Sequence, residues 1–187
     1  IPDSVTSIGK EAFSGCTDLT SIIIPDSVTS IGKHAFYECR NLRSITIPDG
    51  LTSIGEGAFS RCMKLSAIEV GAGNISYADV DGVLFNKKKT LLVTYPKGKK
   101  GTNYDVPDGV ATIGVAAFYK CRSLRSITIS DGGTSIGEEA FHACSSLTSI
   151  TIPDSVTRIG NYAFFACALT SITIPDSVTS IGDYAFR

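Results

Sequence analysis

The sequence predicts a solenoid, a right-handed and curved superhelix of β-rich coils of about 23 residues with a parallel sheet along one side. Two observations lead to this fold class. The phrase Ile1-Pro2-Asp3 returns along the chain, with its first position at Ile24, Ile47, Val106, Ile129, Ile152 and Ile174. The cysteines repeat with the same spacing, as Cys16, Cys39 and Cys62 and again as Cys121, Cys144 and Cys167. A fixed period of roughly 20 to 50 residues is the sequence signature of stacked coils.

Each unit contains one segment that alternates apolar and polar residues and is rich in β-branched side chains. In the first unit this segment is 19–24, and its equivalents include 42–47, 65–70, 124–129 and 147–152. Such alternation predicts a half-buried strand. Pro-Asp follows most of these segments and favours a turn, because proline fixes φ and aspartate bonds to nearby backbone. Stacked coil on coil, the strands are expected to form the parallel sheet.

The rest of each unit carries a shorter extended segment and a turn. Residues 5–8 form the extended segment, and Gly9 ends it. The spacing of Ala12, Phe13 and Cys16 then predicts a helical or 3₁₀ turn. The phenylalanines of this turn recur in every regular unit, and we expect them to stack inside the solenoid: Phe13, Phe36, Phe59, Phe118, Phe141, Phe164 and Phe186.

One unit is longer than the others. Between Val70 and Val106 the sequence contains two β-rich runs, 83–85 and 91–93, which flank a polar turn. This pattern predicts an inserted β-hairpin. We therefore treat residues 73–105 as an irregular, hairpin-bearing repeat inside a single repeat domain that spans 1–187. The chain begins in the middle of the repeated phrase, so we expect it to be a fragment of a longer array.

The repeated phrase also resembles a known family. Ile-Pro-Asp-Ser-Val-Thr-Ser-Ile-Gly, followed by Ala-Phe, Cys and Leu-Thr-Ser-Ile at fixed intervals, is similar to the BspA-like, or Treponema pallidum type, leucine-rich repeats. The resemblance covers essentially the whole chain. The asparagine of ordinary leucine-rich repeats is replaced here by Ser4, Ser27, Gly50 and Gly109. Other groups must therefore satisfy the backbone of the turn.

Composition and spacing argue against several functions. The net charge of -1 argues against a nucleic-acid binder, which usually has a basic surface. The two histidines, His34 and His142, occupy different positions of the repeat, so we expect no catalytic pair and no enzyme. The cysteines do not follow a zinc-binding spacing. We expect them to be buried, reduced small hydrophobes, with oxidation or metal binding as the alternatives, and we expect no cofactor.

The surface expected to recognise a ligand is the part of the coil that varies. The outward positions of the long sheet are monotonous serine and threonine, whereas the positions beside Ala-Phe and after Cys change from unit to unit. Exposed aromatic residues and arginines are typical anchors of interfaces. The variable positions include His34 and Tyr184. The candidate residues are Tyr37, Glu38, Arg40, Tyr119, Lys120, Arg122, His142, Tyr162 and Phe165, with Lys87, Lys88 and Lys89 of the predicted hairpin. The lysines are equally consistent with a solvated tip that deters edge pairing.

Two functions remain open at the level of sequence. The resemblance implies a cell-surface or secreted, non-enzymatic binding module whose partner is a protein, such as a host extracellular-matrix protein, or which mediates adhesion. The alternative is a structural spacer that presents another domain. We expect no nucleic-acid partner and no insertion into a membrane, because the apolar stretches are only a few residues long.

Overall fold

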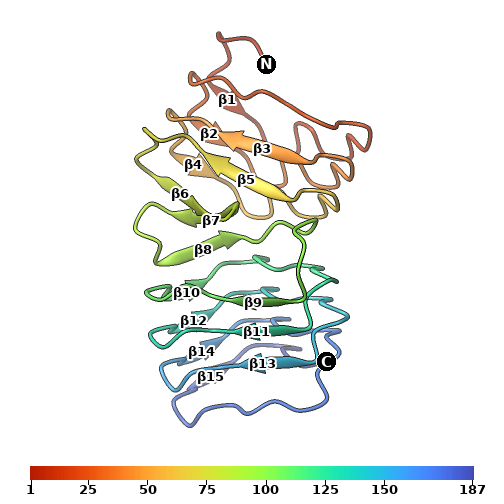
Figure 1. Ribbon diagram of the computed structural model, residues 1–187, viewed down its shortest axis with the longest axis vertical. Helices are drawn as coiled ribbons and strands as arrows, with labels where there is room; N and C mark the ends of the chain where they lie inside the picture. The colour runs from red at the N-terminus through yellow and green to blue at the C-terminus, as the bar shows by residue number, and fades with distance from the viewer. The chain divides into compact units, whose positions relative to one another are not determined.

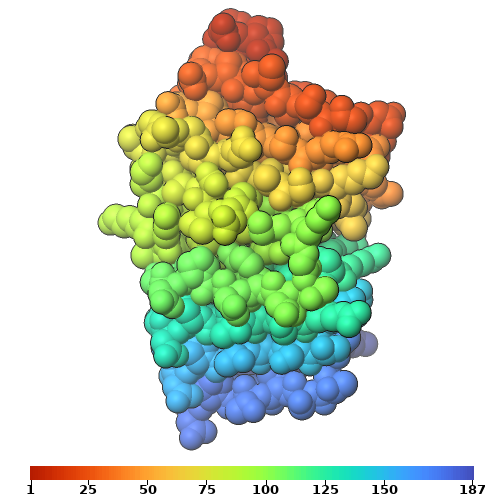
Figure 2. Space-filling model, viewed as in Figure 1, coloured from red at the N-terminus to blue at the C-terminus, as the bar shows by residue number.

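The computed structural model describes all 187 residues and is a β-solenoid with fifteen short strands. The chain divides into two compact units, residues 1–88 with 94–99 and residues 89–93 with 100–187. Within each unit the coils follow one another as stacked layers (Figure 1). The space-filling view shows the same layers as successive bands of colour (Figure 2). The predicted solenoid architecture is confirmed for both units.

The first unit, which we call unit 1, contains two parallel sheets and a hairpin. The short sheet has the order β1-β2-β4, and the long strands β3 and β5 pair with Ile45 opposite Ile68. The strands of this unit are β1 (Ser7–Ile8), β2 (Ser30–Ile31), β3 (Ser44–Ile47), β4 (Ser53–Ile54), β5 (Ala67–Val70), β6 (Tyr77–Val80) and β7 (Val83–Asn86). The predicted strand at 42–47 and its equivalent at 65–70 are therefore present, each shortened at its start, whereas the strand predicted at 19–24 is not formed.

The second unit, unit 2, repeats the arrangement. Its short strands pair in parallel in the order β8-β10-β12-β14-β15, and its long strands pair in the order β9-β11-β13. The strands are β8 (Leu91–Thr94), β9 (Asn103–Asp105), β10 (Thr112–Ile113), β11 (Ser126–Thr128), β12 (Ser135–Ile136), β13 (Ser149–Thr151), β14 (Arg158–Ile159) and β15 (Ser180–Ile181). Equivalent residues of neighbouring coils face each other, as Ile127 and Ile150 do.

The irregular repeat contains an antiparallel hairpin that the sequence analysis did not identify. Strands β6 and β7 pair antiparallel, and Asp81 and Gly82 form the turn between them with φ of 50° and 74°. Two consecutive left-handed residues define the two-residue hairpin turn for which Asp-Gly is a preferred sequence. The strands expected at 83–85 and 91–93 are present as β7 and β8.

The turn around Phe13 is not helical, which corrects the predicted helical or 3₁₀ turn. The amides of Ala12 and Cys16 donate to Gly9 O and Phe13 O, at 3.3 Å and 3.2 Å. Between them the Phe13 amide donates to Ala35 O of the next coil at 2.7 Å. The segment is therefore a run of β-turns whose alternate amides bind the neighbouring coil.

Two positions of every such turn adopt a left-handed backbone. In the first coil these positions are Glu11, with φ of 58°, and Gly15, with φ of 74°. Left-handed residues at the third position of a β-turn are the mark of type II turns, which favour glycine. Most coils nevertheless place a residue with a side chain there: His34, Glu38, Arg61, Ala116, Lys120, Glu139, Ala143, Tyr162, Ala166 and Tyr184. Each of these residues costs about 1–2 kcal/mol relative to a right-handed backbone.

A column of stacked phenylalanine rings runs through the core of each unit. In unit 1 the rings of Phe13 and Phe36 are 5.2 Å apart and almost parallel, at 2°. In unit 2 the Phe141 ring lies 5.0 Å from Phe118 and 5.1 Å from Phe164. Phe36, Phe118 and Phe141 are fully buried. The predicted internal column is therefore confirmed within each unit.

Serine and threonine side chains replace the asparagine of ordinary leucine-rich repeats. Ser27 Oγ donates to Val5 O at 2.7 Å, and Ser155 Oγ donates to Gly133 O at 2.8 Å. Threonines at another repeat position do the same, as when Thr52 Oγ1 donates to Thr29 O at 3.1 Å. Each bond joins one coil to the coil before it. The hydroxyls therefore satisfy carbonyl groups that would otherwise lack partners.

In the irregular repeat a buried asparagine, and not a hydroxyl, hydrogen-bonds to the backbone of the preceding coil. Asn74 Nδ2 donates to Pro48 O at 2.6 Å and to Leu51 O at 3.0 Å, and Oδ1 accepts from the amides of Ser76 and Tyr77 at 2.8 Å and 2.7 Å. The side chain is completely buried. Asn74 therefore fixes the start of β6 against the preceding coil.

The aromatic column predicts how stability is distributed in unit 2. We expect Phe141→Ala to lower the free energy of unfolding by about 3–5 kcal/mol, because the ring is buried between two others. Phe186 has one neighbouring ring, at 5.2 Å, and is 38% exposed. Phe186→Ala should therefore cost less than half as much in urea melts. Equal losses at the two sites would contradict a stack held by nearest neighbours.

The left-handed turns predict a stabilising substitution. Ala143 has φ of 55°, at the position that Gly15 occupies in the first coil. We expect Ala143→Gly to raise the free energy of unfolding by roughly 0.5–1 kcal/mol, because relief of the left-handed strain exceeds the entropy that glycine gains when unfolded. Ala140→Gly in the same coil is the control, since Ala140 is buried and does not have a left-handed backbone. The control should destabilise, and stabilisation by both substitutions would refute this explanation.

Candidate interaction surface

In unit 2 the residue that follows each core phenylalanine faces outward and forms a second aromatic column. Tyr119 follows Phe118, and its ring stacks on His142 at 5.0 Å with an interplanar angle of 28°. His142 in turn stacks on Phe165 at 5.0 Å and 25°. All three outer rings are half-buried. The 23-residue register therefore places one outer ring above the next.

A second outer row joins the first. Tyr162 and Tyr184 occupy one of the left-handed turn positions, and their rings stack at 5.1 Å. Tyr162 also meets the edge of Phe165 at 5.7 Å, which connects the two rows. We call Tyr119, His142, Phe165, Tyr162 and Tyr184 the outer aromatic ladder. Cations lie at its ends, since Lys120 Nζ is 5.4 Å from the Tyr119 ring centre and Arg187 is 5.4 Å from that of Tyr184.

Unit 1 carries a smaller cluster of the same residue types. Tyr37 lies 5.1 Å from the His34 ring, and the Arg61 guanidinium lies 5.2 Å from the Tyr37 ring centre. Glu38 accepts hydrogen bonds from both Arg61 and Arg40, the latter at 3.0 Å. These two bonds hold the pKa of the Glu38 carboxyl below its usual value. The cluster is therefore an aromatic ring held beside a charged network.

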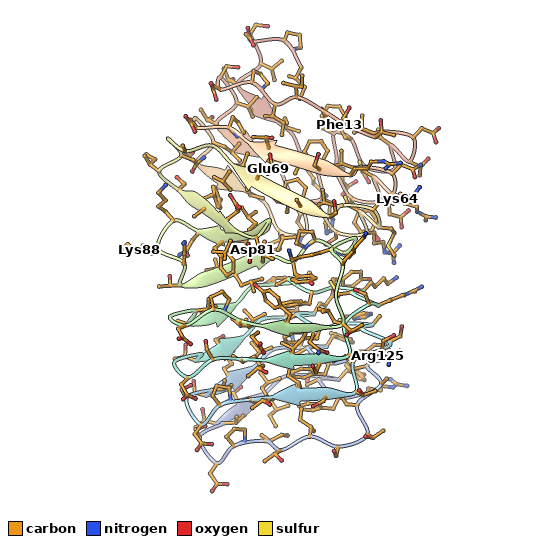
Figure 3. The ribbon with its side chains drawn as sticks, in the orientation of Figure 1. Phe13, Lys64, Glu69, Asp81, Lys88 and Arg125 are labelled. Carbon is orange, nitrogen blue, oxygen red and sulfur yellow. The ribbon has the colours of Figure 1, made fainter.

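The structure brings most of the candidate residues together, in two groups. Tyr37, Glu38 and Arg40 belong to the unit 1 cluster, and Tyr119, Lys120, His142, Tyr162 and Phe165 belong to the unit 2 ladder. Arg122 is exposed but takes no part in the ring contacts of the ladder. Lys87, Lys88 and Lys89 are exposed after β7, and Lys88 lies at the outer edge of unit 1 (Figure 3).

Sequence reasoning missed two members of these groups, Arg61 and Arg187. Arg61 occupies the same repeat position as Glu38, one coil later. The 23-residue period therefore implies that the two side chains lie beside each other, as the structure shows. Arg187 is three residues beyond Tyr184 and lies over that ring. Both cations sit beside residues that the variable positions had already identified.

The cysteines form an internal column that has its own hydrogen bonds. Cys39 Sγ donates to Phe13 O at 3.1 Å, and Cys62 Sγ donates to Phe36 O at 3.0 Å. All six are free thiols, and four are buried. Cys16 is exposed and Cys167 is half-buried, which corrects the expectation that all six are buried.

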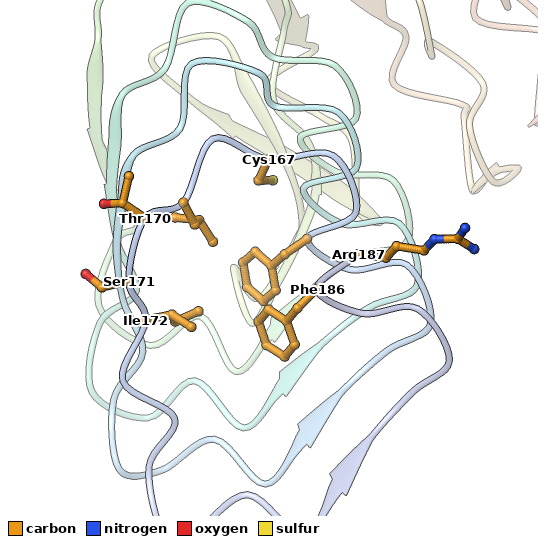
Figure 4. Close-up of a pocket in the computed structure, with 8 residues that line it drawn as sticks. Cys167, Thr170, Ser171, Ile172, Phe186 and Arg187 are labelled. Carbon is orange, nitrogen blue, oxygen red and sulfur yellow. The ribbon is translucent and has the colours of Figure 1, made fainter.

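A hollow of about 240 Å³ lies at the last coil of unit 2 (Figure 4). It is lined by core residues, among them Phe164, Cys167, Ile172 and Phe186. In the inner coils the equivalent side chains are covered by the following coil. Thr170, Ser171 and Arg187 complete the lining, so the hollow joins core side chains to a polar rim. No helix in the structure is long and apolar enough to cross a membrane.

A family model matches nearly the entire chain. The model for the BspA type leucine-rich repeat region matches residues 1–100 and 97–187, with six copies of the repeat. No curated protein matches the chain.

Solved structures of bacterial proteins are also similar. The pneumococcal vaccine antigen PcpA has 32% sequence identity and a TM-score of 0.93, and the match covers 97% of this chain and 46% of that protein. A leucine-rich cell surface protein from Faecalibacterium prausnitzii has 38% identity and a TM-score of 0.90, with 100% of this chain and 49% of that protein covered. A Treponema pallidum leucine-rich repeat protein has 26% identity and a TM-score of 0.58, covering 96% of this chain and 79% of that protein. The chain thus spans about half the length of the first two proteins.

The cysteine column predicts a loss of stability in alkali. Burial raises the pKa of the Cys62 thiol from 9.0 to about 12. The unfolded chain therefore releases this proton at a lower pH than the folded chain. Stability is fully present below pH 9 and falls as pH rises toward 12, by about 1.4 kcal/mol per pH unit for this thiol.

Urea melts between pH 8 and 11 test this expectation. Cys62→Ala should flatten the fall in stability with pH, whereas Cys16→Ala should leave the slope unchanged because Cys16 is exposed. A thiol-reactive dye should label Cys16 in the native chain and Cys62 only after unfolding. Rapid native labelling of Cys62, or equal slopes in the two variants, would contradict its burial.

Proposed function

Because the chain belongs to the BspA type leucine-rich repeat family, we propose that it is a non-enzymatic binding module that holds a protein ligand. The observation that supports this proposal best is the outer aromatic ladder of unit 2. Tyr119 and Tyr162 are half-buried in this ladder, and tyrosine is one of the residue types that dominate the energy of protein interfaces. Coil stacking holds these rings in place before a ligand arrives, which lowers the entropy that binding costs.

We further propose that the module acts at a cell surface or outside the cell, and that its ligand is a protein such as one of the host extracellular matrix. The similarity to a leucine-rich cell surface protein and to a vaccine antigen supports this placement. Each of those proteins is about twice as long as this chain, so their remaining parts contribute to whatever they do.

The charged groups of the surface support a role in binding and not in catalysis. Glu38 is held ionised by two arginines, and Glu56 is paired with Lys33 at 2.8 Å. A general acid or base needs a pKa near the working pH, whereas the pKa values of both carboxyls are lowered by their partners.

A structural spacer is the second candidate function. The uniform face of β11 and β13 supports it, because these strands present only serine and threonine outward, at Ser126, Thr128, Ser149 and Thr151. Such a face has little to distinguish one ligand from another. The expected uniformity does not extend to the neighbouring strand β9, which presents Asn103 and Asp105. A spacer would tolerate change on the ladder as well as on the uniform face.

Two matched variants separate the two functions. We expect the chain to bind at least one of immobilised fibronectin, laminin or collagen, and the double change Tyr119→Ser with Tyr162→Ser to weaken that binding by about 30-fold or more. The control, Ser126→Lys with Ser149→Lys, should leave affinity unchanged, because it alters only the long sheet. Circular dichroism melts would verify that both variants stay folded.

Loss of binding only in the lysine variant would place the site on the long sheet and refute the proposed ladder site. Absence of binding to every matrix protein tested would favour the spacer.

A further inference from the structure

A shallow hollow of about 440 Å³ opens in unit 1 at the edge of the long sheet where β3 and β5 begin. It is lined by Arg43, Met63, Lys64, Ser66 and Gly98. Lys64 extends outward at this edge, away from the sheet (Figure 3). None of these residues belongs to the aromatic clusters described above. The hollow is therefore a separate feature of the surface.

The two cations of the hollow have no carboxylate partner. The ion pairs of the structure use other cations, namely Lys10, Lys33, Arg40 and Arg61. Arg43 and Lys64 are exposed, and neither side chain makes an ion pair or hydrogen bond in the structure. Two cations that share one hollow repel each other and favour an anion between them.

The backbone fixes these cations on neighbouring coils. The Lys64 amide donates to Arg40 O at 3.2 Å, and the Ser66 amide and Oγ both donate to Arg43 O, at 2.9 Å and 3.1 Å. Adjacent coils of a parallel sheet are about 4.8 Å apart. Ser66 is the equivalent of Arg43 in the next coil, so Lys64 lies one coil beyond Arg43 and nearer the start of its strand. The two cations are therefore diagonal neighbours on adjacent coils.

No carboxylate of these coils pairs with Arg43 or Lys64, although Glu69 lies on β5 and Glu38 lies in the turn before β3. Strand β3 separates Arg43 from Asp49, and the residues between them span about 20 Å when extended. Asp49 Oδ1 accepts a hydrogen bond from the Gly73 amide at 3.0 Å, so Asp49 is held at its own edge. The hollow is therefore positive although the chain as a whole carries a net charge of only -1.

We propose that this hollow binds sulfate groups of a linear sulfated polysaccharide. The Arg43 guanidinium can bind two oxygens of one anionic group, and the Lys64 ammonium can neutralise a second. Met63, which is 38% exposed, offers an apolar surface to the carbon face of a sugar ring. A chain with anionic groups at intervals can bring one group to each of the two cations.

Two other anionic partners fit the hollow less well. Proteins bind a lipid surface through a projecting cluster of roughly four to eight cations or through an amphipathic helix. The hollow has two cations, and they line a recess. An acidic peptide also needs pockets for its apolar side chains, and Met63 is the only large apolar residue of the lining.

The test measures binding of a fluorescent heparin octasaccharide by anisotropy. Arg43→Gln with Lys64→Gln should weaken binding at least tenfold. The salt dependence of the affinity should become shallower by roughly the two lost ion contacts. The matched control is Lys10→Gln with Arg158→Gln, which removes the same charge from exposed side chains outside the hollow and outside the candidate surface, and should change affinity less than twofold.

Desulfated heparin and phosphatidylserine vesicles are the competing probes. Neither should compete with the octasaccharide at comparable charge concentration. Equal loss of affinity in the two double variants, or no binding by the unaltered chain, would overturn the proposal. Equal binding of desulfated heparin would show that sulfate is not recognised, and stronger binding of the vesicles would assign the hollow to a lipid surface; either result refutes the proposal.

Discussion

The hydrogen bonds between equivalent backbone positions of successive coils are the constraint on which the rest of each unit depends. The Phe36 amide donates to Ala58 O at 2.8 Å in unit 1, and the Phe141 amide donates to Ala163 O at 2.8 Å in unit 2. Once this register is set, every side chain stacks on its equivalent from the neighbouring coil. Some side chains interact favourably with the equivalent position of the adjacent coil. An aromatic ring stacks on the next ring, and a hydroxyl donates to a carbonyl of the preceding coil, so these residue types can recur in every coil.

The same register also requires strained, left-handed backbone at turn positions on the surface. The alternate amides of the turn reach the neighbouring coil only if two positions per coil are left-handed, and most coils place side chains there. Glu38, Tyr162 and Tyr184 all occupy such positions, and all three take part in the outer clusters. The buried columns stay uniform, whereas the left-handed positions vary. The candidate surface is therefore built on backbone that stacking has already fixed.

Periodicity made the coils, the parallel sheets and the phenylalanine column predictable, because each follows from residue type and spacing. The turn around Phe13 was not predictable in this way, since a three-residue spacing fits a helical turn and a run of β-turns equally. The hairpin of β6 and β7 was missed although its Asp81-Gly82 signal was present. The exposure of Cys16 depends on which coil precedes it, which residue type alone does not specify.

The candidate surface was predictable in composition but not in contacts. Variation between units identified Tyr119, His142 and Phe165, and the register alone implies that such residues lie above one another. The edge contact of Tyr162 with Phe165 joins different repeat positions, so only the folded turn determines it.

Net charge alone does not describe where the charges of this solenoid lie. Each repeat position keeps a fixed place on the coil, so cations and carboxylates at different repeat positions are held apart on the surface. Arg43 and Lys64 lie where the long strands begin, and Asp26 and Asp49 lie in the Pro-Asp turns around their ends. Near-neutral composition therefore argues against a uniformly basic surface but not against a local anion site.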